Sequence, residues 1–457
     1  MDAMRHAQSR LRPNLSLALV LPGCLLLAAC SALVTADSAP QASPATTVGP
    51  TPQLAAPEHP KLIPRVKIAE ARGWPPGMKP TPGGGLAVTA FAGALSHPRW
   101  VHVLPNGDVL VAETNAPKRP KDEEGVKAKV MKKVQARAGA GTPSADRITL
   151  LRDADGDGVA EVRSVFLSGL HSPFGMALVG HDFYVANTDA IVRFHYQTGD
   201  TSIHGSGTRI TELPAGDRNH HWTRNIIASA DGARLYATVG SNSNVAEHGM
   251  DEEAGRAAIW EVDLTTGDKR LFATGLRNPN GLTWEPHGGQ LWTVVNERDE
   301  LGDDLVPDYL TSVKRGAFYG WPYSYFGPHV DTRVEPPRPD LVASALAPDY
   351  ALGAHVAPLG LVYSDGAKLP THLGEGMFIG EHGSWNRDPP SGYKVVFVPF
   401  RAGKPTGMPL DVLTGFVNDR GLAYGRPVGV AIDRRGALLV ADDVGNVIWR
   451  VTAVSLP

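Results

Sequence analysis

The sequence predicts an all-β protein, a six-bladed β-propeller that follows an N-terminal lipoprotein signal and a disordered linker. Two observations predict the propeller. The first is the 50 glycines and 38 prolines in 457 residues, which suit many short strands joined by turns. The second is a sequence pattern that recurs six times: a Pro or Arg, an apolar run, a polar turn and a second apolar run. Internal repeats of this kind are typical of folds that stack one unit on the next.

Each repeat predicts a β-hairpin, because β-rich runs flank turn residues such as Asn-Gly or Asp-Gly. Units that cannot bury both faces alone must pack together, and a closed ring leaves no exposed sheet edge. Six units therefore predict six blades, and the loops before the innermost strands should converge at one end, where chemistry is expected. A β-sandwich with chance repeats is the alternative. The six hairpins span residues 97–112, 172–186, 223–239, 278–295, 357–379 and 426–441.

Residues 1–29 are predicted to be a signal peptide. Three arginines precede an apolar run from Leu15 to Ala29, which is too short and too broken for a confident membrane span. The run ends in Leu-Ala-Ala-Cys30, which resembles a bacterial lipobox and implies cleavage before Cys30 and lipidation of its thiol. An ordinary signal peptide with a chance cysteine is the alternative. The expected location is the periplasmic face of a bacterial membrane, with the lipid as the sole anchor.

Residues 30–60 are predicted to be a tether, because they are rich in Ala, Ser, Thr and Pro and almost uncharged, and so cannot bury enough apolar surface to order themselves. The propeller domain is expected over residues 61–457. The mixed-charge run from Lys118 to Lys133 predicts a solvated loop, with partner docking as the lesser interpretation. The net charge of −3 gives no support for nucleic-acid binding, and two cysteines exclude a disulfide framework.

Charged and polar side chains stand where the predicted repeats begin. His221 lies just before the third repeat, and a neutral imidazole at the axial mouth can accept a proton from a substrate hydroxyl, although a histidine pair is more often structural. Three of the six repeats place an arginine at or next to their start, and arginine binds carboxylates in a bidentate way. A structural salt bridge explains any one of them, but three together suggest an anionic ligand on the axis. The arginines are Arg224, Arg277 and Arg426.

Two acidic stretches could bind calcium, which prefers oxygen ligands. The first matches the start of a calcium loop, with carboxylates at positions 1, 3, 5 and 9 and glycine at position 6, but its twelfth residue is Ser164 instead of glutamate. We expect a short structural calcium loop between strands, and a plain Asp/Gly turn is the alternative. Its carboxylates are Asp153, Asp155, Asp157 and Glu161.

The second acidic stretch covers residues 296–304, with Asp299 and Asp303 as candidate calcium ligands. A solvated loop paired to Arg298 explains the same residues equally well.

Over roughly Leu86 to Val451, the chain resembles the soluble quinoprotein sugar dehydrogenases, and within them most closely the sorbosone dehydrogenase group. Four motifs carry the resemblance by their order and spacing. They are Gly275–Leu282 (GLRNPNGL), Gly316–Pro322 (GAFYGWP), Ala357–Leu361 (APLGL), and Gly425–Val430 (GRPVGV) with the following Ala-Asp-Asp at 441–443.

The resemblance implies a six-bladed propeller that holds pyrroloquinoline quinone (PQQ) and Ca²⁺ on its axis. Such enzymes oxidise sugars or aldose-like aldehydes and pass electrons to a separate acceptor, a quinone or a cytochrome. It implies that His221 is the general base, that Arg277 and Asn278 contact the quinone, and that Arg426 binds a carboxylate. The acidic loop from Glu297 to Asp304 falls where the family binds the quinone's calcium, which would polarise the carbonyl that accepts hydride.

The chain also departs from the family. Ser241 stands where the glucose-oxidising members carry an aspartate, Val428 replaces a second arginine, and the calcium loop lacks the usual Gly-Pro. No lysine stands at the expected quinone contact, for which His382 and Arg387 could substitute.

The sequence thus predicts a periplasmic PQQ- and calcium-dependent oxidoreductase that acts on a sugar or a sugar-derived aldehyde. Two alternatives stay open. One is a calcium-dependent lactonase or esterase on a similar propeller, which would need an axial calcium with an open water position and carboxylate ligands from several blades. The other is a non-catalytic propeller that binds a partner or a glycan. A propeller alone supports all three, because the fold does not fix the function.

Overall fold

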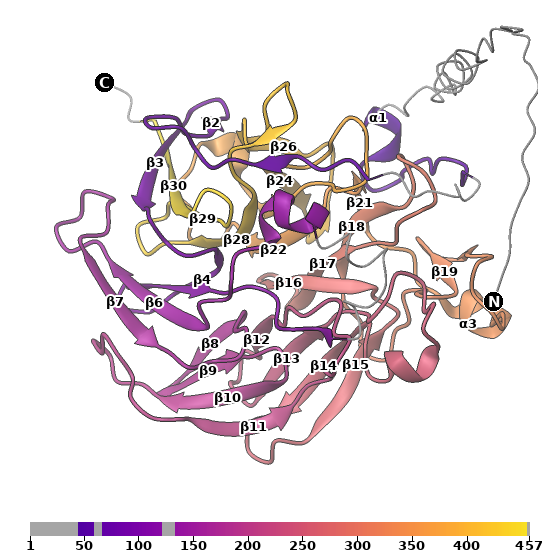
Figure 1. Ribbon diagram of the computed structural model, residues 1–457, viewed down its shortest axis with the longest axis horizontal. Helices are drawn as coiled ribbons and strands as arrows, with labels where there is room; N and C mark the ends of the chain where they lie inside the picture. The colour runs from indigo at the N-terminus through magenta and orange to yellow at the C-terminus, as the bar shows by residue number, and fades with distance from the viewer. Residues whose placement is uncertain (1–43, 59–65, 121–132, 455–457) are drawn as a thin grey trace, which may run out of the picture. The chain divides into compact units, whose positions relative to one another are not determined.

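The structure, a computed structural model, describes residues 44–58, 66–120 and 133–454. It is built mainly from β-strands, and six larger sheets of the described chain are arranged around an axis (Figure 1). The predicted signal peptide, Cys30, and most of the predicted solvated loop at Lys118–Lys133 lie outside the described residues.

Each sheet is one blade. Its strands follow chain order from the innermost strand outward, except that the outermost strands of blades 5 and 6 come from earlier in the chain than their other strands. Blade 1 has β4 (Pro98–Val103), β5 (Val109–Glu113), β6 (Arg147–Arg152) and β7 (Val162–Leu167). Blade 2 has β8 (Met176–Val179), β9 (Asp182–Ala186), β10 (Ala190–His195) and β11 (Thr208–Glu212). Blade 3 has β12 (Ile226–Ala228), β13 (Arg234–Val239), β14 (Ala258–Asp263) and β15 (Lys269–Thr274).

The other three blades follow the same plan. Blade 4 has β16 (Asn278–Glu285), β17 (Gln290–Asn296), β18 (Pro307–Ser312) and β21 (Tyr350–Ala354). Blade 5 has β22 (Pro358–Tyr363), β23 (Gly376–Glu381), β24 (Lys394–Arg401), β26 (Leu410–Thr414) and β2 (Thr81–Pro82), with β25 (Lys404–Pro405) paired to β24. Blade 6 has β28 (Pro427–Ile432), β29 (Leu438–Asp442), β30 (Val447–Ala453) and β3 (Leu86–Ala92).

Short elements lie between and beside the blades. Two small sheets pair β1 (Glu70–Ala71) with β27 (Leu422–Ala423) and β19 (Ser324–Tyr325) with β20 (His329–Val330). The helical turns are α1 (Pro44–Thr47), η2 (Ala136–Ala140), η3 (Met250–Glu253), α3 (Pro339–Ser344) and η4 (Thr371–Leu373). In the part of the chain that the structure describes, no helix combines the length and the apolar character needed to cross a membrane.

The two ends of the described chain close the ring together. The outermost strand of blade 6 is β3, which pairs antiparallel with β30 so that Leu86 stands opposite Ala453. Figure 1 shows this early strand in indigo beside the yellow C-terminal strands. Blade 6 therefore joins three C-terminal strands to one strand from near the start of the propeller, which closes the ring without a covalent link.

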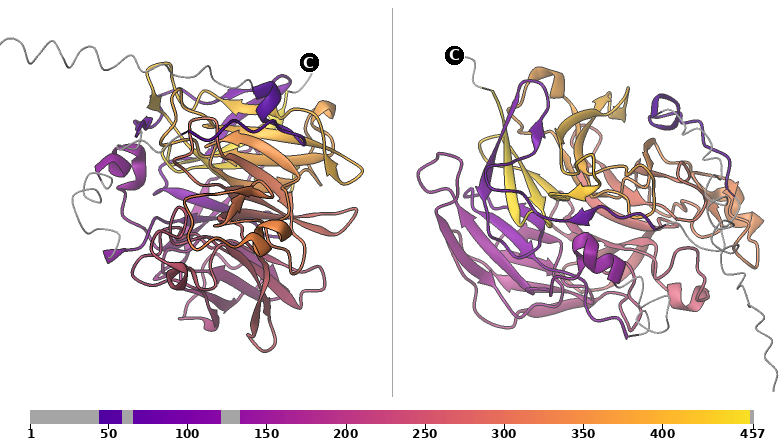
Figure 2. Two further views of the ribbon diagram at one scale, coloured as in Figure 1. Left: turned by 90° about the vertical axis from the view of Figure 1, so that its right-hand side faces the viewer. Right: turned by 45° about the horizontal axis from the view of Figure 1, so that its top comes forward.

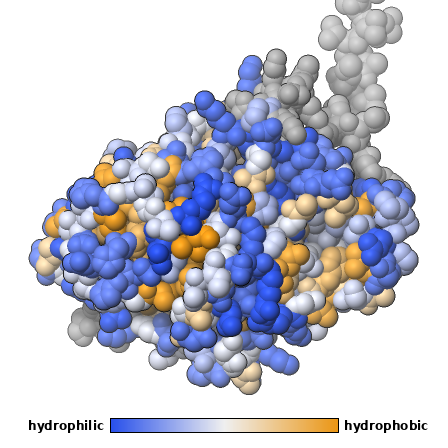
Figure 3. Space-filling model, turned by 90° about the horizontal axis from the view of Figure 1, so that it is seen from below, coloured by the Kyte–Doolittle hydropathy of each residue, from blue (hydrophilic) through white to orange (hydrophobic). Residues whose placement is uncertain are grey.

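Six apolar clusters hold the described blades together, one between each pair of neighbours. Between blades 1 and 2, for example, Trp100 packs against Phe174 with ring centroids 5.0 Å apart, and Phe166 meets Phe183 edge-on at 5.5 Å. Since a blade is buried on both faces, its middle strands read as apolar runs such as Val109–Ala112, all fully buried or nearly so. On the face shown in Figure 3, by contrast, hydrophobic and hydrophilic residues are mixed.

The six hairpins predicted from the sequence are the two innermost strands of the six blades, from β4–β5 to β28–β29. The propeller prediction is confirmed, and the β-sandwich alternative is wrong. Residues 44–58 fall in the predicted tether, yet they contact the propeller: Gly49 pairs with Ala351, and the Glu58 amide donates to the Leu301 carbonyl at 2.9 Å. Their few apolar side chains pack on the blades instead of on one another.

The strand directions sort the loops between the two ends of the ring. The loops before each innermost strand and after each second strand lie at one end, which we call the mouth. The turns between first and second strands, and between third and fourth strands, lie at the other end. The acidic turn 153–161, which joins β6 to β7, is therefore at the end opposite the mouth, next to the β28–β29 turn.

Glu381, on β23, makes stability depend on pH. It is 1% exposed, and its Oε2 atom has no hydrogen-bond partner among the described residues. Burial raises its pKa from 4.5 to about 8. Between these two pH values the folded chain keeps a proton that the unfolded chain releases, so the free energy of unfolding falls as pH rises. Glu381→Gln is expected to flatten this slope, with urea unfolding showing a stabilised variant near pH 8 and little change near pH 4.5.

The matched control is Glu335→Gln at an exposed position, which is expected to leave the pH dependence as it is. A Glu381→Gln variant with an unchanged slope between pH 4.5 and pH 8 would show that Glu381 is ionised in the folded chain.

Candidate functional site at the mouth of the propeller

A cavity of about 370 Å³ opens at the mouth, within the size range of small-molecule sites. Its wall is made by loops that precede innermost strands or follow second strands, as the repeat pattern predicts. Blades 1, 3, 4, 5 and 6 all contribute. The polar lining includes His97, Arg99, Asn115, His220, His221, Arg277, Asn278, Asn296, Glu297, Asp299, Asp308, His355, His382, Arg426 and Asp443.

The loop before β12 holds His221 in one tautomer. Its Nδ1 lies 2.7 Å from the Ser241 carbonyl oxygen, which can only accept, so Nδ1 carries the proton and Nε2 keeps a basic lone pair. Burial, with the nearby charges of Arg277 and His220, lowers the pKa of His221 well below 6.5. The imidazole is therefore neutral at neutral pH, the form that a general base requires.

Arg277, just before β16, is held by oxygens of blades 3 and 4. Its Nη1 donates to the Glu297 carbonyl at 2.5 Å, and its Nη2 donates to Asn244 Oδ1 at 3.0 Å and to Asp299 Oδ2 at 3.3 Å. The neighbouring Asn278 keeps a buried Oδ1 that no donor reaches within the described part of the chain. That atom would lie 2.3 Å from a Cβ on Gly240, so only glycine fits beside it.

Asp299 connects Arg277 to blade 5. Its Oδ1 accepts from Asn386 Nδ2 at 2.8 Å and lies 3.5 Å from His355 Nδ1. Burial raises its pKa, but the hydrogen bond with His355 and the charge of Arg277 outweigh this and hold it below the usual value. Burial lowers the pKa of His355, but its hydrogen bond to Asp299 outweighs this effect and raises the pKa overall.

Asp443 gathers three cationic or potentially cationic groups from blades 1 and 5. Its Oδ2 atom accepts from Arg99 Nη1 at 2.6 Å and from His382 Nε2 at 2.9 Å, and His97 Nε2 lies 3.6 Å away. Burial raises the pKa of Asp443, but the neighbouring His382, His97 and Arg99 hold it below its ordinary range. Burial lowers the pKa of His382 to about 4.

Arg426, just before β28, stands on the same side of the cavity. Its Nη2 donates to the Tyr393 hydroxyl at 2.6 Å, and its guanidinium carbon lies 4.9 Å from the centre of that ring. Its backbone amide donates to Asp442 Oδ1 at 2.8 Å. In residues 44–58, 66–120 and 133–454, the buried Nε atoms of Arg426 and of Arg99 find no acceptor.

Asp308, on β18, is the least expected acid in the wall. Its two oxygens accept the backbone amides of Glu297 and Ala357, both at 2.7 Å. Burial raises its pKa to about 7 in spite of these bonds. Asp308 is thus anchored to two loops of the mouth and can hold a proton near neutral pH.

A roof lies over part of the mouth. Ile68, next to β1, and Ala138 to Ala140 of η2 line the cavity, and Arg137 of η2 donates to Glu70 of β1 at 3.2 Å. Figures 1 and 2 show this purple helix near the middle of the ring and projecting from one side of it. Ile68 and η2 thus form part of the cavity lining in addition to the blades.

The structure brings together six of the predicted residues around the cavity: His221, Arg277, Asn278, Asp299, His382 and Arg426. Three others lie outside its lining. Arg224 is fully buried in the wall, where it donates to Asn219 and to the Pro214 carbonyl. Arg387 donates to the Asp303 carbonyl and to Asp304. Arg387 and Asp303 are thus in contact with each other, outside the cavity lining.

Sequence reasoning missed several polar residues of the cavity wall. His97 and Arg99 begin the first repeat, so the rule that selected Arg277 and Arg426 could have found them. Asp443 lies in one of the family motifs. His355 stands two residues before the fifth repeat, as His221 stands before the third, so the same rule could have found it. Asp308 carries no such signal, because it lies on a third strand, which only the folded ring brings to the mouth.

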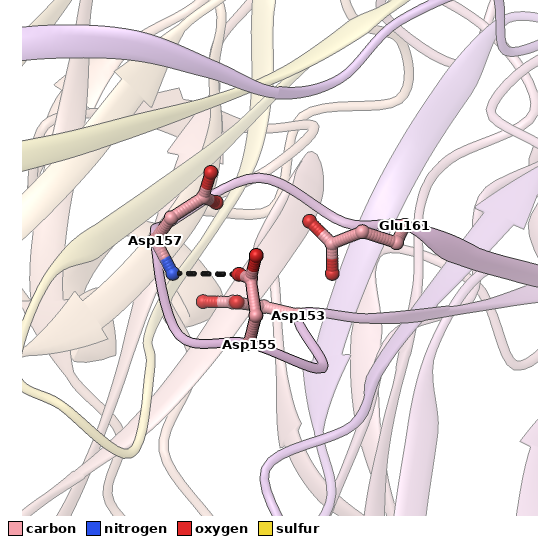
Figure 4. Close-up of side chains that lie close together, drawn as sticks. All are labelled: Asp153, Asp155, Asp157 and Glu161. Carbon is pink, nitrogen blue, oxygen red and sulfur yellow. Dashed lines mark hydrogen bonds between the residues drawn. The ribbon is translucent and has the colours of Figure 1, made fainter.

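The predicted calcium loop lies at the other end, between β6 and β7. One ligand atom from each of its four carboxylates lies within 4.8 Å of the others, and Figure 4 shows the side chains around one turn. Backbone amides already bind them, as Gly156 and Gly158 donate to Asp153 at 2.6 and 3.0 Å. Arg435 from the β28–β29 turn donates to Asp153 at 3.1 Å and also to the Gly156 carbonyl.

Comparison with known proteins places this geometry in a family. The TrAA12-like family matches residues 145–308 and 342–454. An uncharacterized protein of Borreliella burgdorferi is 31% identical over 245 residues, which cover 52% of this chain and 62% of that protein. The PQQ-dependent pyranose dehydrogenase of Coprinopsis cinerea is 26% identical over 308 residues, 52% of this chain and 40% of that enzyme. The chain thus matches less than two thirds of either relative's length.

Solved structures share the fold. A Trichoderma reesei carbohydrate-active enzyme of family AA12 superimposes with a TM-score of 0.66 at 18% identity, covering 85% of this chain and 99% of that one. The holo PQQ domain of the Coprinopsis cinerea pyranose dehydrogenase gives 0.64 at 20% identity, covering 84% and 100%. The PQQ-bound aldose sugar dehydrogenase of Streptomyces coelicolor gives 0.53 at 17%, covering 81% and 100%.

The resemblance to quinoprotein propellers seen in the sequence is confirmed by these matches. The TrAA12-like match spans more than half of the chain, and the protein belongs to the TrAA12-like family of β-propeller proteins.

Proposed function

We propose that the protein is a PQQ-dependent oxidoreductase that oxidises a sugar or a sugar-derived aldehyde, in the manner of the sorbosone dehydrogenase group. One observation carries the proposal: a neutral histidine fixed with a basic Nε2 lines the same cavity as Arg99, Arg277 and Arg426. A proton acceptor beside several permanent positive charges suits a hydroxyl donor next to an anionic cofactor. Membership of a family with PQQ-dependent sugar dehydrogenases among its relatives supports it.

The donor set of the cavity fits PQQ, which carries three carboxylates. Among the residues that the structure describes, Arg99 and Arg426 keep buried Nε–H groups without an acceptor, and Asn278 keeps a buried amide oxygen without a donor. Buried polar groups are normally hydrogen-bonded, so these orphaned atoms indicate a polar ligand. Arg99 and Arg426 would hold the cofactor's anionic groups. Asn278 would meet the cofactor beside Arg277, whose N–H groups all donate to protein oxygens and which would act through its positive charge.

PQQ, when bound, supplies a two-electron acceptor that takes the carbon-bound hydrogen of the substrate as hydride. The Nε2 atom of His221 accepts the proton of the substrate hydroxyl. When the substrate is an aldehyde, this hydroxyl belongs to its hydrated form. The Ser241 carbonyl keeps the imidazole in the required tautomer and stabilises the imidazolium that forms. The roof of η2 and Ile68 limits water in the cavity, which strengthens the charge interactions inside.

The test is reconstitution of the purified protein with PQQ, with dye reduction followed across a panel of aldoses and sugar aldehydes. PQQ binding is measured separately by quenching of tryptophan fluorescence. Turnover that requires PQQ and one class of substrate supports the proposal. A protein that binds no PQQ and reduces no dye would refute it.

We also propose that the protein works at the periplasmic face of the membrane, lipidated at Cys30, and that it passes electrons to a separate quinone or cytochrome. The proposal is supported by the signal and lipobox pattern of residues 1–30, together with the small-molecule chemistry of the cavity.

For calcium, we propose the exposed loop between β6 and β7. Its carboxylates occupy loop positions 1, 3, 5 and 9, and Gly158 at position 6 has a φ of +93°, as the sharp turn of such a loop needs. Arg435 competes with the ion for Asp153. Calcium titration by calorimetry is expected to show one site, lost in an Asp155→Asn, Asp157→Asn double variant and tighter in Arg435→Ala.

The control for that titration is Arg434→Ala, which removes the neighbouring arginine of the same turn and is expected to leave the calcium affinity unchanged. If Arg435→Ala weakens calcium binding, the arginine does not compete with the ion.

A further inference from the structure

The loop after β17, residues 296–304, is where the family resemblance assigns the cofactor's calcium, but in this chain its oxygens face cationic side chains. Arg277 is the central one. Its Nη1 donates to the Glu297 carbonyl at 2.5 Å and lies 3.5 Å from the Asn296 carbonyl, and its Nη2 donates to Asp299 Oδ2 at 3.3 Å. The guanidinium thus bonds two carbonyls and one carboxylate of the loop at once.

The remaining oxygens of Asp299 are also engaged. Asn386 donates to Oδ1 at 2.8 Å, and His355 Nδ1 lies 3.5 Å from the same atom. The Asp299 carbonyl accepts from Arg333 at 2.9 Å and from Asn244 at 3.2 Å. A metal ion at Asp299 would have to displace several of these donors together.

The rest of the loop is bound in the same way. His355 Nε2 donates to the Gly302 carbonyl at 2.9 Å, and Arg387 donates to the Asp303 carbonyl and to Asp304 Oδ1, both at 2.9 Å. The Glu297 side chain pairs with the buried Arg298 at 3.0 Å. Among the buried side-chain oxygens of this loop, only Glu297 Oε1 has no hydrogen-bond partner in the described residues.

This donor set does not fit calcium. Ca²⁺ takes six to eight oxygen ligands at about 2.3–2.6 Å, and the loop offers one orphaned buried oxygen among several that already accept from Arg, His or Asn. We infer that calcium does not occupy the axial loop of this protein and that the guanidinium of Arg277 is the fixed cation there. The inference rests on the proposed function, since it says which charge faces a bound quinone.

A guanidinium in place of a calcium ion at the axial loop has physical consequences. A guanidinium stays charged at every accessible pH and offers directed N–H donors, whereas a calcium ion is lost to a chelator. Arg277 is also held from both sides of the blade 3–blade 4 boundary, by Asn244 and Glu297, so its position does not depend on a ligand. Cofactor binding in this chain should therefore resist calcium chelation.

The experiment separates the axial loop from the exposed one. All variants carry Asp155→Asn and Asp157→Asn, so that the β6–β7 loop no longer contributes calcium binding. Calcium binding is measured by calorimetry with and without PQQ, bound metal is measured by mass spectrometry of the purified protein, and PQQ affinity is measured by fluorescence in EGTA and in excess calcium.

In this background no calcium site is expected, and PQQ should bind equally well in EGTA and in calcium. Arg277→Ala is expected to weaken PQQ binding by about tenfold or more, because a fixed positive charge beside the anionic cofactor is lost. The same variant should gain calcium binding, since the freed Glu297 carbonyl and Asp299 carboxylate can then accept an ion. Arg426→Ala is the matched control: it also removes a cavity arginine but leaves the loop oxygens bonded, so it should gain no calcium.

One calcium bound with Arg277 in place, or PQQ affinity that collapses in EGTA and returns with calcium, would overturn the inference. A failure of PQQ to bind under any condition refutes the proposed function alone. The calcium titrations of the two arginine variants still decide the inference in that case, because they need no cofactor.

Discussion

Replacing His221 by asparagine is expected to lower kcat by about 10²- to 10⁴-fold, the usual contribution of a general base, while PQQ remains bound. Asparagine keeps a side-chain N–H for the Ser241 carbonyl but has no basic nitrogen to replace Nε2. The substrate hydroxyl then has no acceptor for its proton. Stopped-flow dye reduction gives kcat, and fluorescence quenching gives the PQQ affinity of the same sample.

The pH profile supplies a second signature of this base. Burial and the charge of Arg277 hold the pKa of His221 well below 6.5. In the wild-type protein, activity should therefore be retained below pH 6.5 and fall only at more acidic pH, where the imidazole gains a proton. His171→Asn is the control, an exposed histidine paired with Asp189, and it should change neither kcat nor the profile. An active His221→Asn variant with the same acidic limb would assign the base elsewhere.

The largest expected effect on stability comes from Arg298, which is completely buried. Its Nε pairs with Glu297 at 3.0 Å and its Nη1 with Asp331 at 3.2 Å, and it also donates to the Pro322 and Ser324 carbonyls. Removing one partner of a buried ion pair leaves an uncompensated charge. Arg298→Ala is therefore expected to lower the free energy of unfolding by about 3–5 kcal/mol, measured by urea denaturation.

Arg338→Ala provides the contrast, because Arg338 and Asp340 form an exposed pair. Solvent screens such pairs, so no measurable loss of stability is expected. If Arg298→Ala unfolds at the same urea concentration as the wild-type protein, the buried network around Glu297 and Asp331 does not stabilise the fold. The two carboxylates would then be compensated by groups other than Arg298.

The repeats made the blades predictable, whereas the site was predictable only in part. A hairpin is a local pattern, and all six were visible as apolar runs on either side of a turn. The start of a repeat marks the mouth, and this placed Arg277, Arg426 and His221 correctly at the cavity. Arg224 obeys the same rule but turns into the wall, because Asn219 and the Pro214 carbonyl bind it there.

Other features depend on contacts between distant parts of the chain. Asp308 reaches the mouth from the third strand of blade 4, a position that carries no repeat signal. The acidic stretch at 296–304 predicts either calcium ligands or a loop paired to Arg298. Its sequence does not show that Arg277, about twenty residues earlier, binds several of its oxygens. The axial donor set also disfavours the metal-dependent hydrolase alternative, which needs free carboxylates on the axis.

The pairing of β3 with β30 ties the time course of folding to the order of synthesis. Residues 86–92 leave the ribosome first among the blade 6 strands, and their partner at 447–453 leaves last. At a synthesis rate of about 5–20 residues per second, β3 waits roughly 20–70 s for its partner. During that interval the other five blades can form, but blade 6 cannot. The backbone groups of β3 therefore stay unpaired and exposed. Until β30 is available, β3 can pair with a strand of another copy of the chain, so folding depends on keeping the copies apart.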